Sequence, residues 1–203
     1  MKLIGIIIWT FISYIIGSIP FGLIIGKTFF GIDIREKGSG NLGGSNAIRV
    51  LGFLPGLAVL LLDGLKAFLA MTIVYKFQAS AAIFAGVGAC VGHCYPCFAN
   101  YKGGKAVACF YGMLLATGIF LVEDVTFAFV FPLLVFLIVL GLTRYVSLSS
   151  MISSVFAAIL SFILFDKIYA ICITIVVILI IYRHYSNILR ILNNTENKVS
   201  FIK

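Results

Sequence analysis

The stretch Val125–Leu142, VTFAFVFPLLVFLIVLGL, contains no charged residue and decides the fold class of this chain. A helix needs roughly 20 apolar residues to cross the hydrocarbon core of a bilayer, and an uncharged run of this kind is typical of such a helix. Backbone polar groups must all be satisfied inside lipid, and the run is too long for a barrel strand. We therefore expect a transmembrane helix here.

Similar runs occupy most of the chain on both sides of this stretch. The 203 residues are 62% apolar and only 11% charged, which is typical of a polytopic membrane protein. We expect an all-α integral membrane protein with a single transmembrane domain over residues 1–203. Seven expected spans cover approximately residues 3–26, 51–75, 79–99, 106–122, 125–142, 146–165 and 167–183. Five spans with re-entrant segments are the alternative, because residues 106–122 form a short run.

The basic residues predict how the chain is oriented in the membrane. Seven spans put the termini on opposite sides, and the basic residues behind the net charge of +8 divide unevenly between those sides. One side carries Lys27, Arg35, Lys37, Arg49, Lys102, Lys105, Arg144, Arg183, Arg190, Lys198 and Lys203, whereas the other carries Lys2, Lys76 and Lys167. The positive-inside rule then predicts an external N-terminus and a cytoplasmic C-terminus. Orientation and anionic partners, rather than nucleic acid, explain the positive charge.

The polar segment KGSGNLGGSNAIR, residues 37–49, is rich in Gly, Ser and Asn and has a cation at each end. Glycine tolerates positive φ, so such a loop can turn its backbone N–H groups toward an anion. Arg49 can hold a phosphate or carboxylate in a bidentate fork, and Lys37 adds charge. The segment is therefore predicted to bind an anion at the membrane surface.

A second polar loop runs from Gly92 to Lys105 and ends in Lys102-Gly103-Gly104-Lys105 at the start of an apolar helix. Free N–H groups and the positive end of the helix dipole would meet two lysines there, which favours a second anion site. The spacing of a Walker A motif is absent, so nucleotide-driven transport is not indicated.

Two ionisable residues, Asp63 and Lys66, lie inside the second expected span. Charges at that depth are costly, and residues three apart on a helix share a face, so we expect the two to pair. One interpretation is a structural ion pair that fixes helix packing. The other is that Lys66 helps to hold an anionic group and Asp63 sets its position.

The tail after the last span, Arg183-His184-Tyr185-Ser186-Asn187, places His184 and Asn187 on one face of a helix, and Arg190 follows three residues later. A histidine that shares the predicted cytoplasmic side with two basic loops is a candidate acid–base group.

The sequence predicts no metal and no cofactor. Cys94-Tyr95-Pro96-Cys97 is a C-x-x-C, but a zinc site needs a second ligand pair at suitable spacing. Asp33, Glu36 and Glu196 are too widely spaced for a magnesium cluster. A metal-free group transfer between phosphate-bearing molecules at the membrane surface is what these features favour.

Three segments of this chain resemble the motifs of the bacterial acyl-phosphate:glycerol-3-phosphate acyltransferases. They are KGSGNLGGSNAIRVLG (37–52), GHCYPCFANYKGGKAVA (92–108) and RHYSNILRILNNTENK (183–198), with Asp63-Gly64-x-Lys66 and Arg144-Tyr145-Val146-Ser147 between them. The resemblance implies a seven-helix enzyme of the bacterial inner membrane whose site faces the cytoplasm. Such enzymes move a fatty acyl group from acyl phosphate to the 1-hydroxyl of glycerol 3-phosphate, giving lysophosphatidic acid and phosphate.

The resemblance also implies roles for individual residues and partners. Catalytic roles fall on His184, Asn187, Ser39 and Arg49. Substrate-binding roles fall on Lys37, Gly40, Asn41, Asn46, Lys66, His93, Lys102, Gly103, Gly104, Lys105, Ser147 and Glu196. Implied partners are glycerol 3-phosphate, acyl phosphate, membrane lipids and the enzyme that produces acyl phosphate.

The sequence departs from the family pattern at several loop positions. The family usually has proline at the position of Leu42, Ala-Thr at Gly44-Ser45, and glycine at Ala106 and Asn194. These departures affect the shape of the loops more than their charged or hydroxyl groups.

Two other functions are compatible with part of this pattern. A membrane acyltransferase that uses acyl-CoA or acyl carrier protein typically carries H-x-x-x-x-D, whereas His93 and His184 are followed at that spacing by Phe98 and Leu189. An organic-anion transporter would use the same cations, but it needs polar groups along a path to the outer face, and the outer loops are short.

Overall fold

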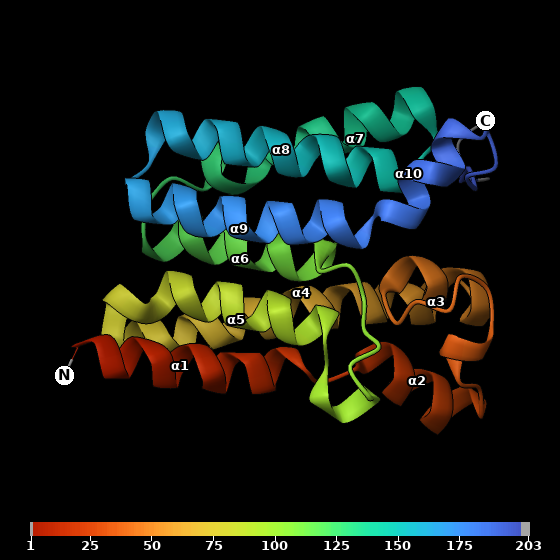
Figure 1. Ribbon diagram of the computed structural model, residues 1–203, viewed down its shortest axis with the longest axis horizontal. Helices are drawn as coiled ribbons and strands as arrows, with labels where there is room; N and C mark the ends of the chain where they lie inside the picture. The colour runs from red at the N-terminus through yellow and green to blue at the C-terminus, as the bar shows by residue number, and fades with distance from the viewer. Residues whose placement is uncertain (1, 200–203) are drawn as a thin grey trace. The chain divides into compact units, whose positions relative to one another are not determined.

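The structure is a computed structural model that describes residues 2–199, and every regular element in that range is helical. The all-α prediction is therefore confirmed. The chain forms two compact units, Met1–Ala116 and Thr117–Lys203, each of which is a helical bundle in its own right (Figure 1). Lys203, one of the cations predicted to be cytoplasmic, lies outside the described residues.

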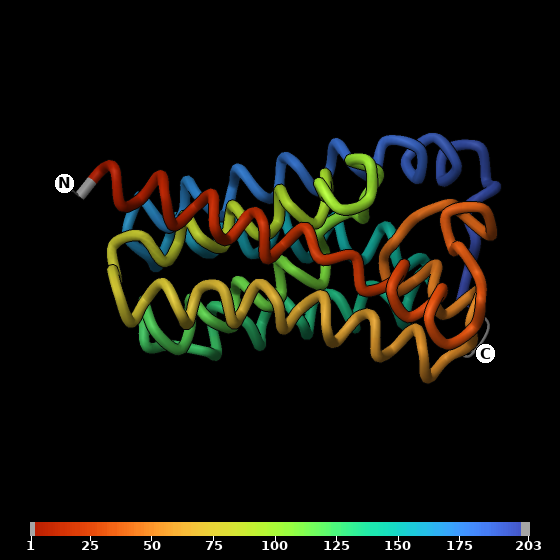
Figure 2. Tube along the Cα trace, turned by 90° about the horizontal axis from the view of Figure 1, so that it is seen from below, coloured from red at the N-terminus to blue at the C-terminus, as the bar shows by residue number. Residues whose placement is uncertain are grey.

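The first unit is a bundle of long helices whose polar loops lie at one end (Figure 1). Its elements are α1 (Lys2–Gly17), α2 (Phe21–Phe30), η1 (Ile34–Glu36), α3 (Gly44–Leu51), α4 (Phe53–Gln78), η2 (Ala79–Ala81), α5 (Ala82–Cys94), η3 (Cys97–Ala99) and the first part of α6 (Val107–Phe120). The chain reverses direction at η2, so α4 and α5 form a hairpin, and α1 packs along α5 (Figure 2).

Glycines bring α1 and α5 into backbone contact. A Cβ built on Gly88 would lie 2.3 Å from the carbonyl oxygen of Thr10, and one on Gly92 would lie 2.1 Å from that of Tyr14. Helices in lipid gain little from apolar burial against one another, so their interfaces are rich in small residues that allow close approach. The Gly88-x-x-x-Gly92 spacing therefore explains why α5 packs against α1.

The chain breaks completely between α1 and α2, at Ser18–Pro20. Proline has no N–H to donate into a helix, and α2 begins directly after Pro20. The break turns α2 away from α1, and α2, α3 and both polar loops lie at the same end of this unit (Figures 1 and 2).

The second unit is a bundle whose helices follow one another along the chain. It contains the end of α6, the π-helical turn η4 (Thr126–Val130), α7 (Phe131–Thr143), α8 (Val146–Leu164), α9 (Lys167–Arg183) and α10 (Tyr185–Leu192). α8 packs against both α7 and α9. Several buried serines of α8 donate to carbonyl groups one turn earlier in the chain, as Ser149 and Ser150 do to those of Tyr145 and Val146.

The structure supports membrane insertion, while the number of seven spans stays a prediction. Helices are found within all seven expected spans. Within the described residues, four helical stretches are long and apolar enough to cross a membrane, namely Leu3–Phe30, Phe53–Ala99, Thr126–Thr143 and Val146–Leu164. The pair α9 and α10, bent by 54°, raises the number to five. The stretch Phe53–Ala99 contains both arms of the α4–α5 hairpin, and α6 is too short to be included.

Two departures from the family pattern fall on unusual backbone conformations. Ala106 and Asn194, which stand where the family has glycine, have φ of 60° and 56°. This left-handed region costs a non-glycine residue roughly 1–2 kcal/mol, although asparagine tolerates it better. The conformation explains why glycine is usual at both positions.

Replacing Ala106 with glycine is expected to stabilise the protein by about 1 kcal/mol, because relief of the left-handed strain outweighs the greater backbone freedom of glycine in the unfolded chain. Denaturation of the purified protein in detergent measures the effect. Ala82→Gly is the matched control, since Ala82 has an ordinary helical φ of −60° and should lose stability. Equal losses in both variants would contradict the explanation.

Candidate active site

The loop of residues 37–49 is organised around the buried side chain of Asn46. The two protons of its amide nitrogen reach three carbonyl groups, those of Ile34, Lys37 and Asn41 at 2.8, 3.2 and 2.9 Å, so one proton is shared between two of them. Its amide oxygen accepts the backbone N–H of Ser39 at 2.8 Å. Asn46 therefore uses both of its polar atoms to hold the loop together, which makes it part of the framework rather than a substrate ligand.

Two glycines let the loop close over this asparagine. Gly38 and Gly40 have φ of 60° and 69°, and a Cβ on Gly38 would lie 2.4 Å from the amide oxygen of Asn46. Asn41 adds a local turn, because its side-chain oxygen accepts the N–H of Gly43 at 2.9 Å. Asn41 and Asn46 therefore shape the loop together with these glycines.

What the loop presents to its surroundings is mainly a set of side chains. The N–H groups of Ser39 and Gly40 are bonded inside the loop, so the predicted backbone nest is only partly formed. The side chains of Lys37, Ser39 and Arg49 are exposed. Two cations and a hydroxyl on a rigid loop form a suitable anion site, with Arg49 as the bidentate group.

An ion pair that the sequence did not single out fixes the base of this loop. Arg35 donates from Nε and Nη2 to the two carboxylate oxygens of Asp33, at 2.9 and 2.6 Å, and Lys27 approaches the same carboxylate at 3.3 Å. The Arg35 guanidinium holds the pKa of Asp33 well below its usual range. Arg35 also reaches the carbonyl of Ala99 at 3.5 Å, which links the two polar loops. The signal in the sequence is the Asp33-x-Arg35 spacing alone.

The glycine pair of the second loop packs against His93. Gly104 donates its N–H to the carbonyl of His93 at 3.0 Å. A Cβ on Gly104 would lie 1.9 Å from Nε2 of the His93 ring, and one on Gly103 would lie 2.1 Å from the His93 carbonyl oxygen. Both glycines are buried, whereas Lys102 is exposed and Lys105 is half-buried. The glycines are therefore required for close packing, and the lysines provide the charge.

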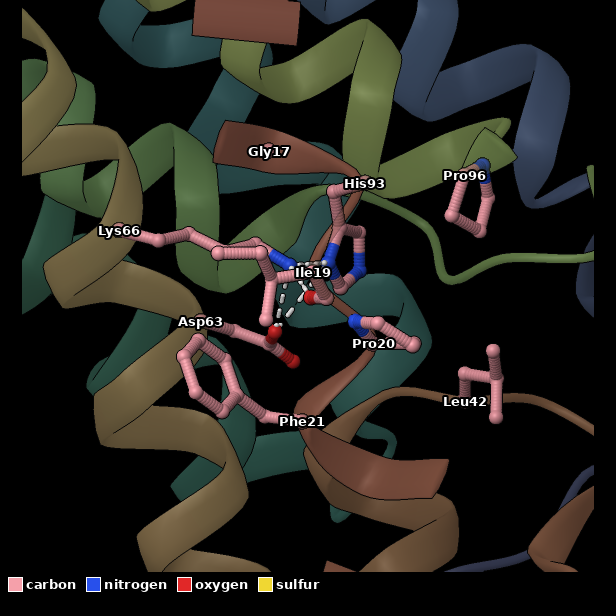
Figure 3. A pocket seen from close by; sticks show the side chains of 9 residues that line it. All are labelled: Gly17, Ile19, Pro20, Phe21, Leu42, Asp63, Lys66, His93 and Pro96. Atoms are coloured by element: carbon pink, nitrogen blue, oxygen red, sulfur yellow. Dashed lines mark hydrogen bonds and ion pairs between the residues drawn. The ribbon is translucent and has the colours of Figure 1, made fainter. Parts of the chain in front are cut away.

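His93 belongs to a buried charged cluster with Asp63 and Lys66 (Figure 3). The ammonium nitrogen of Lys66 lies 2.8 Å from Asp63 Oδ1, 2.9 Å from the Ile19 carbonyl oxygen and 3.0 Å from His93 Nδ1. The predicted pairing of Asp63 with Lys66 is confirmed. All three side chains are buried, and they line a cavity of about 10 Å³, which is room for about one water molecule.

These contacts account for all three protons of the Lys66 ammonium group. A lysine can donate three hydrogen bonds, and here the acceptors are a carboxylate, a carbonyl and an imidazole nitrogen. Beside a charged Lys66, His93 Nδ1 is the acceptor, and the proton of the neutral ring is then on Nε2, beside Gly104. The same Nδ1 lies 3.4 Å from Asp63 Oδ1. The structure thus places Lys66 and His93, predicted to bind substrate, in an internal network in which all three protons of Lys66 are bonded.

In the second unit, Glu196 connects three other polar residues. Its Oε1 accepts from Ser147 at 2.7 Å and from Asn187 at 2.6 Å, and its Oε2 accepts from Arg190 Nε at 2.7 Å. Burial opposes ionisation, but these three donors outweigh it and lower the pKa of Glu196. Glu196 is therefore a charged clamp that fixes Ser147 and Asn187.

Replacing Glu196 with glutamine is expected to destabilise the protein by roughly 1–3 kcal/mol at neutral pH. Both carboxylate oxygens of Glu196 accept hydrogen bonds, whereas the amide nitrogen of glutamine cannot accept one. The lowered pKa means that this stability is present above the pKa of the unfolded chain and is lost as pH falls through the folded value. The difference between wild type and variant should therefore shrink in acid, as denaturation measured across pH will show. Glu123→Gln, at an exposed position, is the control, and an equal loss there would contradict the clamp.

His184 lies at the bend between α9 and α10 and is almost completely buried. Its Nδ1 is 2.8 Å from the carbonyl oxygen of Ile180, so Nδ1 carries the proton and donates. In the neutral ring Nε2 is then the basic nitrogen. An orienting contact therefore comes from α9 itself, and the Asn187 side chain donates to Glu196.

The predicted site residues thus fall into two groups. Each group is assembled within one unit. The first unit contains Lys37, Ser39, Gly40, Asn41, Asn46, Arg49, Lys66, His93, Lys102, Gly103, Gly104 and Lys105, and the second contains Ser147, His184, Asn187 and Glu196.

Comparison with known proteins adds the family context. Residues 7–194 match the family model described as glycerol-3-phosphate acyltransferase. The chain is 45% identical over 193 residues to glycerol-3-phosphate acyltransferase 3 of Bacillus anthracis, covering 95% of this chain and 94% of the relative. It is 46% identical over 192 residues to the Bacillus subtilis (strain 168) glycerol-3-phosphate acyltransferase, covering 94% and 96%.

Two crystal structures share the fold across nearly the whole chain. Both are of PlsY (YgiH), described as an integral membrane glycerol 3-phosphate acyltransferase. The glycerol 3-phosphate form gives a TM-score of 0.86 at 34% identity and covers 96% of each chain. The lysophosphatidic acid form gives a TM-score of 0.84 at 33% identity, covering 96% of this chain and 95% of that one.

Proposed function

This chain belongs to the glycerol-3-phosphate acyltransferase family of integral membrane acyltransferases, and we propose that it takes its acyl group from acyl phosphate. The acceptor is the 1-hydroxyl of glycerol 3-phosphate, and the products are lysophosphatidic acid and inorganic phosphate. The observation that carries the proposal is the rigid loop of residues 37–49, which presents Ser39 and Arg49 on a framework closed by Asn46.

Two phosphate groups require two sets of ligands. The first is Lys37, Ser39 and Arg49 on the Asn46 loop, and the second is Lys102 and Lys105 beside the buried glycine pair. A guanidinium fork suits a phosphate that must be held in one orientation, whereas lysines act as point charges. Both sets are cationic and lie on loops that packing or hydrogen bonds hold in place.

The chemistry needs little more than binding and orientation. Acyl phosphate is a mixed anhydride, so the acceptor hydroxyl can attack the carbonyl carbon directly while the bond from that carbon to the phosphate oxygen breaks. The electron pair leaves with the phosphate, and cations beside it stabilise the developing charge. The hydroxyl proton passes to Nε2 of His184 or to a phosphate oxygen of the donor.

The proposed setting is the bacterial inner membrane, with seven spans, an external N-terminus and a cytoplasmic site. Support comes from the helices found within each expected span and from the basic residues clustered in the polar loops. Glycerol 3-phosphate would then reach the loops from the cytoplasm. The acyl chain of the donor would lie among the helices, in continuity with the bilayer.

The test is an acyl-transfer assay on purified protein with glycerol 3-phosphate and, in parallel, acyl phosphate, acyl-CoA or acyl carrier protein as donor. The expected result is lysophosphatidic acid from acyl phosphate alone. Product only from a thioester donor would contradict the proposed donor, and no product from any donor would contradict the proposed function.

A further inference from the structure

The buried cluster of Asp63, Lys66 and His93 joins three parts of the first unit. Asp63 and Lys66 come from α4, His93 is near the end of α5, and the carbonyl of Ile19 lies in the break between α1 and α2. Figure 3 shows the Lys66 ammonium group between Asp63, Ile19 and His93. A charged pair in such a place is costly to bury, so its contacts are the guide to what it does.

One side of the cluster bears directly on the second polar loop. The three atoms nearest to a Cβ built on Gly104 all belong to the His93 ring, at 1.9 to 2.8 Å. The ring therefore lies immediately beneath the backbone of Gly104. Its orientation is fixed in turn by the 3.0 Å contact between His93 Nδ1 and Lys66.

We propose that Asp63, Lys66 and His93 are positioning residues. They hold the Lys102–Lys105 loop in the position needed to bind phosphate and do not themselves bind substrate. Asp63 orients Lys66, Lys66 orients His93, and the His93 ring supports Gly104. The inference rests on the proposed function, because it assigns Lys102 and Lys105 to a substrate phosphate. It also explains why glycine occupies position 104, where any side chain would meet the ring.

A reciprocal change of size between positions 93 and 104 tests this support directly. His93→Ala removes the ring, and Gly104→Ala pushes against it, so each is expected to lower kcat/KM by about 10²-fold through displacement of the loop. In the double variant the new methyl group occupies the space that the ring has left. Its kcat/KM is expected to recover at least about tenfold over either single variant, because the two sites are in contact and non-additive.

Gly103→Ala supplies the matched control. A Cβ at Gly103 would meet the backbone carbonyl oxygens of His93 and Cys94, at 2.1 and 2.6 Å, so loss of the His93 ring cannot relieve it. The pair His93→Ala and Gly103→Ala should therefore show no recovery. The proposal is overturned if kcat/KM of the His93→Ala and Gly104→Ala double variant is no higher than that of the poorer single variant. It is also overturned if both single variants have the kcat/KM of the wild type.

Hydrogen–deuterium exchange separates this inference from the proposed function. The backbone of residues 95–105 should exchange faster in each single variant and return toward the wild-type rate in the His93→Ala and Gly104→Ala double variant. If wild-type protein transfers no acyl group, the proposed function fails, while the exchange result still decides whether His93 supports the loop. If neither single variant exchanges faster than the wild type, the proposal that His93 supports the loop is overturned.

Discussion

Substitution of His184 by alanine is expected to lower the turnover number by about 10²–10⁴-fold, the range found when a general base is lost. The physical reason is the 2.8 Å contact from Nδ1 to the carbonyl of Ile180, which leaves Nε2 as the basic nitrogen of the neutral ring. Steady-state rates with both substrates saturating give the turnover number, and the fall should appear there rather than in KM alone.

Tyr185→Phe is the control for this substitution, since Tyr185 is the neighbouring residue and its side chain is exposed. Thermal denaturation of both variants separates loss of catalysis from loss of structure. Turnover of His184→Ala close to that of wild type would contradict a role as base and would assign proton removal to the phosphate of the donor.

Substitution of Lys66 by methionine is expected to destabilise the protein by about 3–5 kcal/mol, because it leaves the buried carboxylate of Asp63 without its partner. The carbonyl of Ile19 and Nδ1 of His93 lose a donor in the same step. Chemical denaturation in a defined detergent measures the loss.

The paired variant Asp63→Leu with Lys66→Met is the companion measurement. Removing both charges with apolar groups of similar size is often neutral, so the pair should recover most of the stability that the single variant loses. Because the support of His93 by Lys66 is still missing, the activity should not recover with it. A Lys66→Met variant as stable as wild type would contradict the description of this cluster as a buried ion pair.

Several features of the fold follow from local sequence patterns. The uncharged runs predicted the helices, and the spacing of three between Asp63 and Lys66 predicted their pairing. Both depend on neighbours along the chain, where helical geometry decides the outcome.

The contacts that build the candidate site depend on how separate elements pack, and local sequence patterns do not reveal them. Nothing in the spacing of His93 relative to Lys66 indicates that their side chains meet, because the contact depends on how α5 packs on α4. Asn46 looked like one polar residue among several, yet it closes the first loop through four hydrogen bonds to distant backbone groups. Glu196 likewise becomes a clamp only once the tail folds back to Ser147.

The roles of the glycines in the two loops were also only partly predictable from the sequence. Their abundance in both loops suggested backbone nests for anions, and the positive φ values of Gly38 and Gly40 fit that idea. Gly103 and Gly104, however, are buried against His93, so their lack of a side chain serves close packing. Sequence alone does not distinguish a glycine needed for its dihedral angles from one needed for space.

The most direct test of the proposed function is the stoichiometry of the reaction catalysed by the purified wild-type protein with glycerol 3-phosphate and acyl phosphate. Mass spectrometry quantifies the lipid product while a phosphate assay follows the leaving group. We expect one lysophosphatidic acid for each phosphate released, and no release without glycerol 3-phosphate beyond the enzyme-free rate. Phosphate release without acylated glycerol phosphate, or no reaction at all, would contradict acyl transfer as the activity of this chain.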